Sequence, residues 1–308
     1  MPVELEYDYA AATSAMDKFS QDDINYLKQW TQNLDKSKYV PKDLTDKQLV
    51  LFYNACYGDL ERTKTCVEKY YSCRKNSPEF FDNRKVNSPE MAPIVEALEF
   101  SVLPGKSVEG YDVIYHRLHY TEPSKYNFEL GVKLFFMTID MCLSKRGPQN
   151  GLIFLFDMRG VKLGHLARCG LSFQKDKQRG FRKFFVYLQE ALPVRMRAIH
   201  ILNTEPVLDK LLLIIKPFME KKFYDMLNFH HKDEDLESFF ETVIPRSVIP
   251  QDHGGTLPDT QTLHKKCMQF LQAMEPYFRE EEEQRILALP DKKRDKAMEK
   301  AFKNLDID

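Results

Sequence analysis

The stretch "HILNTEPVLDKLLLIIKPFMEKKF", from His200 to Phe223, is the most hydrophobic helix-like segment of a chain that is otherwise polar on average. Wound on an α-helix, the apolar side chains between Val207 and Met219 fall within an arc of roughly 160°. Charged side chains occupy the opposite side, with Leu213 as an apolar residue among them. Lys210 and Lys216 interrupt the apolar run, which stays short of the ~18 residues that a membrane span needs. The segment is therefore not predicted to cross a membrane.

The residues of this segment leave two interpretations open. It can be a core helix packed on a sheet. It can also be a gate, whose apolar face covers a cavity and whose outer face touches a membrane through Leu213 and the lysines that follow. Pro217 removes one helical hydrogen bond, so a kink is predicted near the end of the helix. Periodicity alone does not choose between the core helix and the gate.

Composition restricts the class of protein. The 308 residues are 43% hydrophobic, which is enough for a large buried core, and the length is typical of about two domains. With 45 basic and 46 acidic side chains the net charge is −1, so no nucleic-acid partner is expected. The six cysteines show no CxxC pair and no histidine at metal-ligand spacing, as is typical of reduced thiols. We therefore expect no metal and no cofactor.

The sequence divides into three parts. Residues 1–90 predict a small helical subdomain of three short amphipathic helices, two of which begin at Ser20 and Thr45. Strand patterns follow at 111–120, 151–158, 197–203 and 225–230, and helical segments at 127–145, 178–192 and from 206 onward separate them. This alternation predicts an α/β domain at 91–258 with a mostly parallel sheet. Residues 259–308 are predicted to form a polar helical C-terminal extension. The acidic start MPVELEYDYA predicts no signal peptide, so a cytoplasmic protein is expected.

Motifs for catalysis are scarce. The sequence has no GxSxG, no glycine-rich phosphate loop and no HExxH. Cys56 and Arg62 have the spacing of a thiol phosphatase, but two acidic residues between them would repel a phosphate. Asp157 ends a strand pattern and is interpreted as a turn or capping residue, and His200 as a core histidine. Enzyme function is therefore not predicted.

Three motifs occur in an order that resembles the CRAL-TRIO lipid-binding family: "GLIFLFDMRG" (151–160), "LPVRMRAIHILNTEPVLDKLLLIIKPFMEKKF" (192–223) and "VIPRSVIPQDHGG" (243–255). The resemblance covers about residues 20–258 and is nearest to the family's tocopherol- and retinaldehyde-carrying members. It implies an α/β fold in which a three-helix subdomain precedes a mostly parallel sheet with flanking helices. It also implies a mobile lid helix, here Leu202 to Phe218, over an apolar pocket. The "LNTEP" before this helix is one residue longer than the family's usual "INEP".

The resemblance also implies which residues line the pocket. They come from the strands, the helices between them and the lid, and they are Tyr115, Val132, Phe135, Phe136, Ile139, Leu152, Phe154, Phe156, Val161, Leu163, Phe184, Tyr187, Leu188, Leu192, Val194, Ile199, Leu208, Leu211, Leu212 and Ile215. Each of them also has an ordinary interpretation as a core residue. A cavity with so few polar groups would take a ligand with few polar groups.

The function implied is that of a monomeric carrier, not an enzyme. It would hold one hydrophobic small molecule, similar to a tocopherol, retinoid or carotenoid, and would transfer it between membranes. The alternative is a phosphoinositide- or phospholipid-sensing exchange or adaptor protein, with Arg195, Arg197 and Lys222 at positions where relatives bind head groups. Met226 and the segment Leu51 to Cys56 replace basic residues of the family, which weakens this alternative. The sequence does not identify the ligand.

Overall fold

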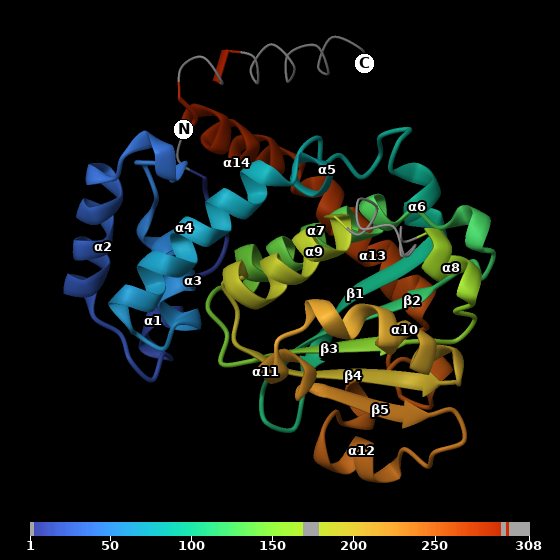
Figure 1. Cartoon of the computed structure of the whole chain (residues 1–308). Helices are drawn as coiled ribbons and strands as arrows, with labels where there is room; N and C mark the ends of the chain where they lie inside the picture. Colours follow the sequence, from blue (N-terminus) through green and yellow to red (C-terminus); the bar gives the residue numbers. More distant parts are fainter. Residues whose placement is uncertain (1–2, 169–178, 291–293, 296–308) are drawn as a thin grey trace.

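The structure is a computed structural model that describes residues 3–168, 179–290 and 294–295 (Figure 1). Its helices are α1 (Tyr9–Ser14), α2 (Gln21–Asn33), α3 (Asp46–Ala55), α4 (Leu60–Asn76), α5 (Pro78–Phe81), α6 (Ala92–Ala97), α7 (Phe128–Arg146), α8 (Leu163–Arg168), α9 (Arg179–Val186), α10 (Val207–Ile215), α11 (Lys221–Tyr224), α12 (Glu237–Thr242), α13 (Thr260–Ala273) and α14 (Glu275–Leu287). Its strands are β1 (Leu98–Lys106), β2 (Asp112–Leu118), β3 (Leu152–Asp157), β4 (Met196–Thr204) and β5 (Leu227–His231).

The three helices predicted near the N-terminus are α2, α3 and α4, and short helices α1 and α5 flank them. Helix α2 begins where the Ser20 side chain accepts a hydrogen bond from the Asp23 amide. At the start of α3, Thr45 and Gln48 form a capping box, which satisfies two backbone amides that the helix leaves unpaired. The predicted starts at Ser20 and Thr45 are therefore confirmed.

A five-stranded sheet in the order β1-β2-β3-β4-β5 forms the centre of the second half. The predicted strands correspond to β2, β3, β4 and β5, which pair in parallel. Strand β1, which pairs antiparallel with β2, was not predicted from the sequence. It contains Pro104 and Gly105, which are uncommon inside strands and tolerated at a sheet edge. The α/β fold with a mostly parallel sheet is confirmed.

Each face of the sheet carries its own hydrophobic cluster. On one face, Ile114, Phe154 and Ile199 pack with apolar side chains of α7, α9 and α10. The other face is covered by α12 and the segment that follows it, and its cluster includes Tyr115 and Phe239. Figure 1 shows α10 lying over β3 and β4, and α12 beyond β5. Within the described residues, no helix combines the length and apolarity required to span a membrane.

The predicted C-terminal extension begins as part of the packed structure. Helix α13 runs against β1 and α7, and it buries Leu263, Cys267 and Leu271. Helix α14 lies near the C-terminal end of α4 (Figure 1), where Arg74 bonds Glu281, and its Phe278 is fully buried. Both helices therefore contribute apolar side chains to the core, although their sequences are polar on average. Residues 291–293 and 296–308 of the predicted extension lie outside the described residues.

The extra residue of "LNTEP" is accommodated as a β-bulge at the end of β4. Ile201 pairs with Phe229 and Thr204 with His231, so three steps along β4 oppose two steps along β5. Asn203 takes a left-handed backbone conformation with φ of 55° inside the bulge. Its side-chain amide donates to the Asp157 carboxylate at 2.8 Å. The bulge therefore sets where β4 ends and where the connection to α10 begins.

Candidate functional site

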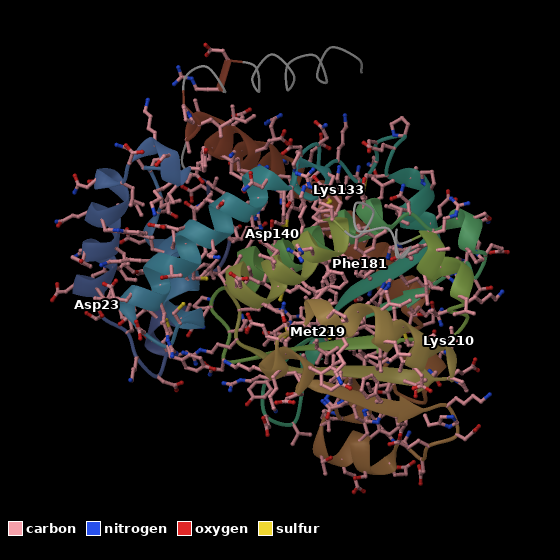
Figure 2. The ribbon with its side chains drawn as sticks, viewed as in Figure 1. Asp23, Lys133, Asp140, Phe181, Lys210 and Met219 are labelled. Carbon is pink, nitrogen blue, oxygen red and sulfur yellow. The ribbon has the colours of Figure 1, made fainter. Side chains whose placement is uncertain are left out.

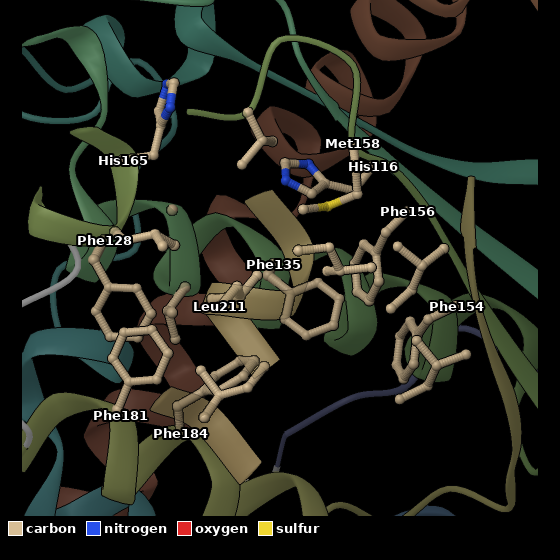
Figure 3. A pocket seen from close by; sticks show the side chains of 18 of the residues that line it. His116, Phe128, Phe135, Phe154, Phe156, Met158, His165, Phe181, Phe184 and Leu211 are labelled. Carbon is tan, nitrogen blue, oxygen red and sulfur yellow. The ribbon is translucent and has the colours of Figure 1, made fainter. Parts of the chain in front are cut away.

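An apolar cavity lies between one face of the sheet and helices α7, α9 and α10 (Figure 3). The volume of this cavity is about 270 Å³. Strand alternation accounts for the sheet side of its wall, because Phe154 and Phe156 of β3 point to the same face. Helical spacing accounts for the α7 side, where Phe128, Val132 and Phe135 follow one another at four and three residues. The cavity is thus built from the repeat patterns of the elements around it.

Aromatic rings dominate this wall. The rings of Phe128 and Phe181 stack with centroids 4.3 Å apart, and Phe135 lies 5.1 Å from Phe154. The centroids of Phe154 and Phe156 are 6.0 Å apart with nearly parallel planes. Figure 3 shows these rings grouped around the open space. Such a wall offers large apolar contact and little hydrogen bonding, which suits a ligand with the same balance.

The acidic side chain on the wall is already engaged. The Asp157 carboxylate accepts from the Arg159 amide at 3.0 Å, from the Arg159 Nε at 2.6 Å and from Asn203. It follows that Asp157 stabilises the turn after β3, as the sequence suggested. Gly160 completes this turn with φ of 78°, a conformation that glycine adopts without strain.

Two histidines border the cavity. The His165 Nδ1 accepts from the Lys162 amide at 3.0 Å, and its Nε2 is enclosed by protein atoms without a partner among the described residues. His116 contacts the carbonyl oxygen of Glu99 through Nδ1 at 3.1 Å. Burial lowers the pKa of His165, and it lowers the pKa of His116 to about 4. Both rings are therefore neutral near pH 7.

Helix α10 closes the cavity on the side away from β3. Leu208 is buried in it, whereas Leu213 on the opposite side is 77% exposed. The α-helix ends at Ile215 and continues as a 3₁₀ turn from Lys216 to Phe218, so the regular α-helix stops before Pro217. The position of Leu213 fits the outer face predicted for a gate.

One glutamine bonds the far end of this segment. The Gln189 Nε2 donates to the Phe218 carbonyl at 3.0 Å, and its Oε1 accepts from the Glu220 amide at 2.7 Å. Gln189 belongs to a single π-helical turn, Tyr187–Ala191, that follows α9. The ring of Phe218 also lies parallel to Phe185 with centroids 6.4 Å apart. These contacts hold the segment after α10 against α9.

The predicted pocket residues separate into two groups. Those that border the cavity are Val132, Phe135, Phe154, Phe156, Val161, Phe184, Leu188, Ile199, Leu208, Leu211, Leu212 and Ile215. Those that do not are Tyr115, Phe136, Ile139, Leu152, Leu163, Tyr187, Leu192 and Val194.

The second group has ordinary structural places. Tyr115 faces the other side of the sheet, where its hydroxyl lies 2.7 Å from the His253 Nε2. Phe136 stacks on Phe81 with centroids 5.1 Å apart, and the Tyr187 hydroxyl accepts from Arg74. Leu163 is 49% exposed at the start of α8. The remaining four pack in the main hydrophobic cluster without bordering the cavity: Ile139, Leu152, Leu192 and Val194.

Sequence reasoning missed several wall residues. They are Leu98, Phe100, His116, Leu118, Tyr126, Phe128, Gly131, Asp157, Met158, His165, Leu166, Phe181, Phe185, Ile201, Met219, Phe223 and Leu227. Some carried a usable signal, because Phe181 and Phe185 precede Leu188 by seven and three residues on one helical face. Leu98 and Phe100 belong to the strand that the sequence did not predict.

The basic residues assigned to head-group binding differ in availability. Arg195 is buried, donates through Nε to the Asn54 carbonyl at 2.8 Å and lies over the ring of Tyr57. Arg197 donates to the Asn150 carbonyl at 2.7 Å. Lys222 is exposed on α11. Arg195 therefore supports local structure, whereas Arg197 and Lys222 are both exposed.

Other candidate chemistry has a structural explanation. Cys56 caps the end of α3, and Arg62 pairs with Asp59 on the surface. The His200 Nδ1 lies 3.0 Å from the His230 Nε2, on the sheet face opposite the cavity. No group of three or more metal-binding side chains occurs among the residues that the structure describes.

The sequence pattern of the CRAL/TRIO domain matches residues 98–255, which contain the whole sheet and α10. The chain belongs to the CRAL/TRIO domain family. Residues 17–91 match a second pattern, described as Pinta-like, UBA domain. The resemblance to CRAL-TRIO lipid-binding and transfer proteins is thereby confirmed.

Individual relatives agree with this membership. The chain is 29% identical to the human Alpha-tocopherol transfer protein-like over 220 residues, 71% of this chain and 61% of that protein. It is 22% identical to Clavesin-1 of Xenopus laevis over 193 residues, 62% of this chain and 55% of that protein. Among solved structures, Sfh5 is similar with a TM-score of 0.47 and 14% identity over 80% of this chain and 92% of that chain. The chain thus spans less than two thirds of the length of the first two relatives.

Proposed function

We propose that this CRAL/TRIO protein is a non-enzymatic carrier that binds one hydrophobic small molecule and transfers it between membranes. The observation that carries the proposal is the aromatic cavity beneath α10, a helix with an exposed apolar residue on its outer face. An isoprenoid-like ligand, such as a tocopherol, retinoid or carotenoid, suits a long wall of phenylalanine and leucine. The name of the tocopherol-transfer-like relative supports the same class.

An apolar cavity that shields such a ligand from water stabilises it. Each CH₂ group that leaves water for an apolar environment gains about 0.8 kcal/mol. A ligand that buries ten such groups therefore gains about 8 kcal/mol by staying enclosed. Free exchange through water is slow at that cost, so delivery requires the lid to open at a membrane. Helix α10 is the proposed lid, and Leu213 and Lys222 are its proposed membrane contacts.

The test is to extract lipids from the protein purified from the cells that express it. Mass spectrometry of the extract is expected to find one isoprenoid-like molecule per protein chain. The matched control is the same chain with Phe156→Asp, which places a carboxylate on the cavity wall and is expected to carry none. An extract without any stoichiometric lipid would contradict the carrier proposal.

The alternative proposal is phosphoinositide or phospholipid exchange. The engagement of Arg195 and Arg197 in local hydrogen bonds weighs against it. A phospholipid as the stoichiometric ligand in the same extract would favour this alternative. Binding to vesicles that contain phosphoinositides, together with its loss in Lys222→Ala, would also favour it.

A further inference from the structure

We propose that His116 makes the cavity selective for a ligand that carries a hydroxyl group, by accepting a hydrogen bond from that hydroxyl at Nε2. The inference rests on the proposed carrier function and specifies the chemistry of the ligand's polar end. A cavity with this acceptor distinguishes alcohols and phenols from aldehydes, ethers and esters that have the same apolar skeleton.

The first step is the state of the ring. The partner of His116 Nδ1 is the carbonyl oxygen of Glu99, at 3.1 Å. A carbonyl oxygen can only accept, so Nδ1 carries the proton and donates it. The neutral ring then presents a lone pair at Nε2, because one nitrogen of neutral imidazole is a donor and the other an acceptor. Burial disfavours the charged form and lowers the pKa of His116 to about 4, so this form is the stable one near pH 7.

The second step is the position of the ring. His116 stacks on Phe100 with centroids 4.1 Å apart and an angle of 15°, and Phe156 meets it edge-on at 5.9 Å. Three contacts, two aromatic and one with the backbone, therefore fix its orientation. Figure 3 shows the ring beside Met158 at the border of the cavity, among side chains that are otherwise mostly hydrocarbon. Nε2 has no hydrogen-bond partner among the described residues. Unlike the Nε2 of His165, it is not enclosed by protein atoms.

The third step is the comparison with other polar groups on the wall. Asp157 accepts three hydrogen bonds within the turn after β3, and its side chain is buried there. The Nε2 of His165 is enclosed by protein atoms, so it is not available to a ligand. Tyr126 also borders the cavity and can donate or accept. His116 is thus the acceptor that is fixed and sterically open, and Tyr126 is the residue to test against it.

The difference between a ligand that donates a hydrogen bond and one that only accepts has a measurable consequence. A hydroxyl ligand satisfies Nε2, whereas an aldehyde or ether oxygen brings a second acceptor against it. A net hydrogen bond of ordinary strength corresponds to roughly three- to tenfold in affinity. An apolar site without such a group would treat the two ligands almost equally.

The experiment measures dissociation constants for two matched pairs of probes, retinol with retinal and α-tocopherol with its methyl ether. The full-length chain is expected to bind the hydroxyl member of a pair about three- to tenfold more tightly. His116→Phe should bring the two constants together, and His116→Gln, which can accept near the same position, should restore part of the preference. Tyr126→Phe and Met158→Leu should keep it. Thermal unfolding of each variant identifies any that fail to fold.

Equal binding of both members by the wild-type chain would overturn the inference while leaving the carrier function intact. The same holds if the aldehyde binds more tightly, because Nε2 would then be a donor. Loss of the preference in Tyr126→Phe, with His116→Phe unchanged, would also overturn it. If the folded chain binds none of the four probes, the proposed ligand class fails and this inference fails with it.

Discussion

At the scale of single residues, whether a side chain borders the cavity depends on which face of its helix or strand it lies on. Phe156 borders the cavity and lies within about 6 Å of the rings of Phe154 and His116. Phe229 on β5 is 38% exposed and does not border the cavity. The two phenylalanines belong to the same sheet, so they form a matched pair for mutation.

Phe156→Asp is expected to weaken ligand binding about 100-fold or more. A carboxylate on an apolar wall without a partner costs several kcal/mol, and each 1.4 kcal/mol corresponds to a factor of ten. Phe229→Asp should leave affinity unchanged. Titration of both variants with a fluorescent retinoid measures the difference. Unchanged affinity in a folded Phe156→Asp protein would mean that the cavity is not the ligand site.

The predicted pocket residues that border the cavity come mostly from elements with one clearly buried face. Phe154 and Phe156 alternate along β3, and Leu208, Leu211 and Leu212 follow the apolar face of α10. Several of those that do not border it come from elements that are buried on all sides, where the spacing of apolar residues does not indicate which side chains face a cavity. Tyr115 lies in a strand whose neighbouring residues Val113 and Ile114 are both buried.

The same limit applies to α7. Nearly every residue of this helix from Gly131 to Ser144 is buried, so Phe135 and Phe136 have similar burial and opposite environments. Which of them borders the cavity is decided by the placement of α5, because Phe136 stacks on Phe81. The resemblance to the family predicted a lid helix in this segment and a pocket beside it. The individual wall residues required the three-dimensional arrangement.

At the scale of elements, α10 has the properties of a lid with two different faces. Figure 2 shows Lys210 near one end of the segment and Met219 near the other, with the helix lying across the strands. Leu208 is buried beneath it and Leu213 is exposed above it. A core helix packed on the sheet would also expose its outer face, so the behaviour of a Leu213 variant is what separates the core helix from the gate.

Leu213→Asp is expected to slow transfer of ligand between vesicles about 10- to 100-fold and to leave ligand affinity nearly unchanged. Burial of one leucine in a membrane contributes about 1.5–3 kcal/mol, and the aspartate removes it. The matched control is Leu287→Asp, which changes a leucine that is 53% exposed on α14, away from the lid. Transfer rate and thermal midpoint are measured on the same preparation. A large fall in midpoint with normal transfer per folded molecule would contradict the lid.

Gln189 provides a second test of the lid. Its side chain bonds both Phe218 and Glu220, so it joins the end of the lid segment to the π-helical turn. Gln189→Leu removes both hydrogen bonds and is expected to speed ligand release about three- to tenfold. Gln189→Glu keeps the acceptor for the Glu220 amide but sets a carboxylate oxygen against the Phe218 carbonyl, so it should speed release as well. Gln272→Leu on the surface of α13 is the control, and equal release rates in all variants would show that these bonds do not restrain the lid.

At the scale of the whole molecule, a buried ionic network joins the helical N-terminal region to the sheet and to the C-terminal helices. Arg74 of α4 bonds Asp140 of α7 at 2.6 Å and Glu281 of α14 at 3.0 Å. Arg84 bonds the same two carboxylates, and Arg285 adds a further bond to Glu281 at 2.9 Å. Asp140 is labelled at the meeting point of these helices in Figure 2.

This network fixes the relative positions of α4, α7 and α14, so the wall that α7 gives to the cavity depends on residues far from it in sequence. A buried ion pair adds little net stability, yet removing one partner leaves an unpaired charge and costs about 3–5 kcal/mol. Burial alone would raise the pKa of Glu281, but Arg285, Arg84 and Arg74 lower it to about 2. The carboxylate therefore stays charged in the folded protein well below the pH at which it would protonate in an unfolded chain.

These pKa shifts predict how acid unfolds the protein. Burial lowers the pKa of His116, His200 and His253 to about 4, against an ordinary value of about 6.5. Between these values the unfolded chain binds protons that the folded chain does not. The free energy of unfolding should therefore fall as pH drops from about 6.5 to about 4, by up to about 1.4 kcal/mol per pH unit for each histidine.

Glu281 acts over a lower range, because its folded pKa of about 2 lies below its ordinary value. The stability that it contributes is present above about pH 4.5 and is lost as pH falls toward 2. Urea unfolding at a series of pH values measures both ranges. Glu281→Gln should lower stability by about 3–5 kcal/mol at pH 7 and remove the decline in the lower range, while the decline above pH 4.5 remains. Glu283→Gln, an exposed acid on the same helix, is the control. A free energy of unfolding that stays constant between pH 7 and pH 5 would contradict the neutral buried histidines, including the state of His116 on which ligand selection depends.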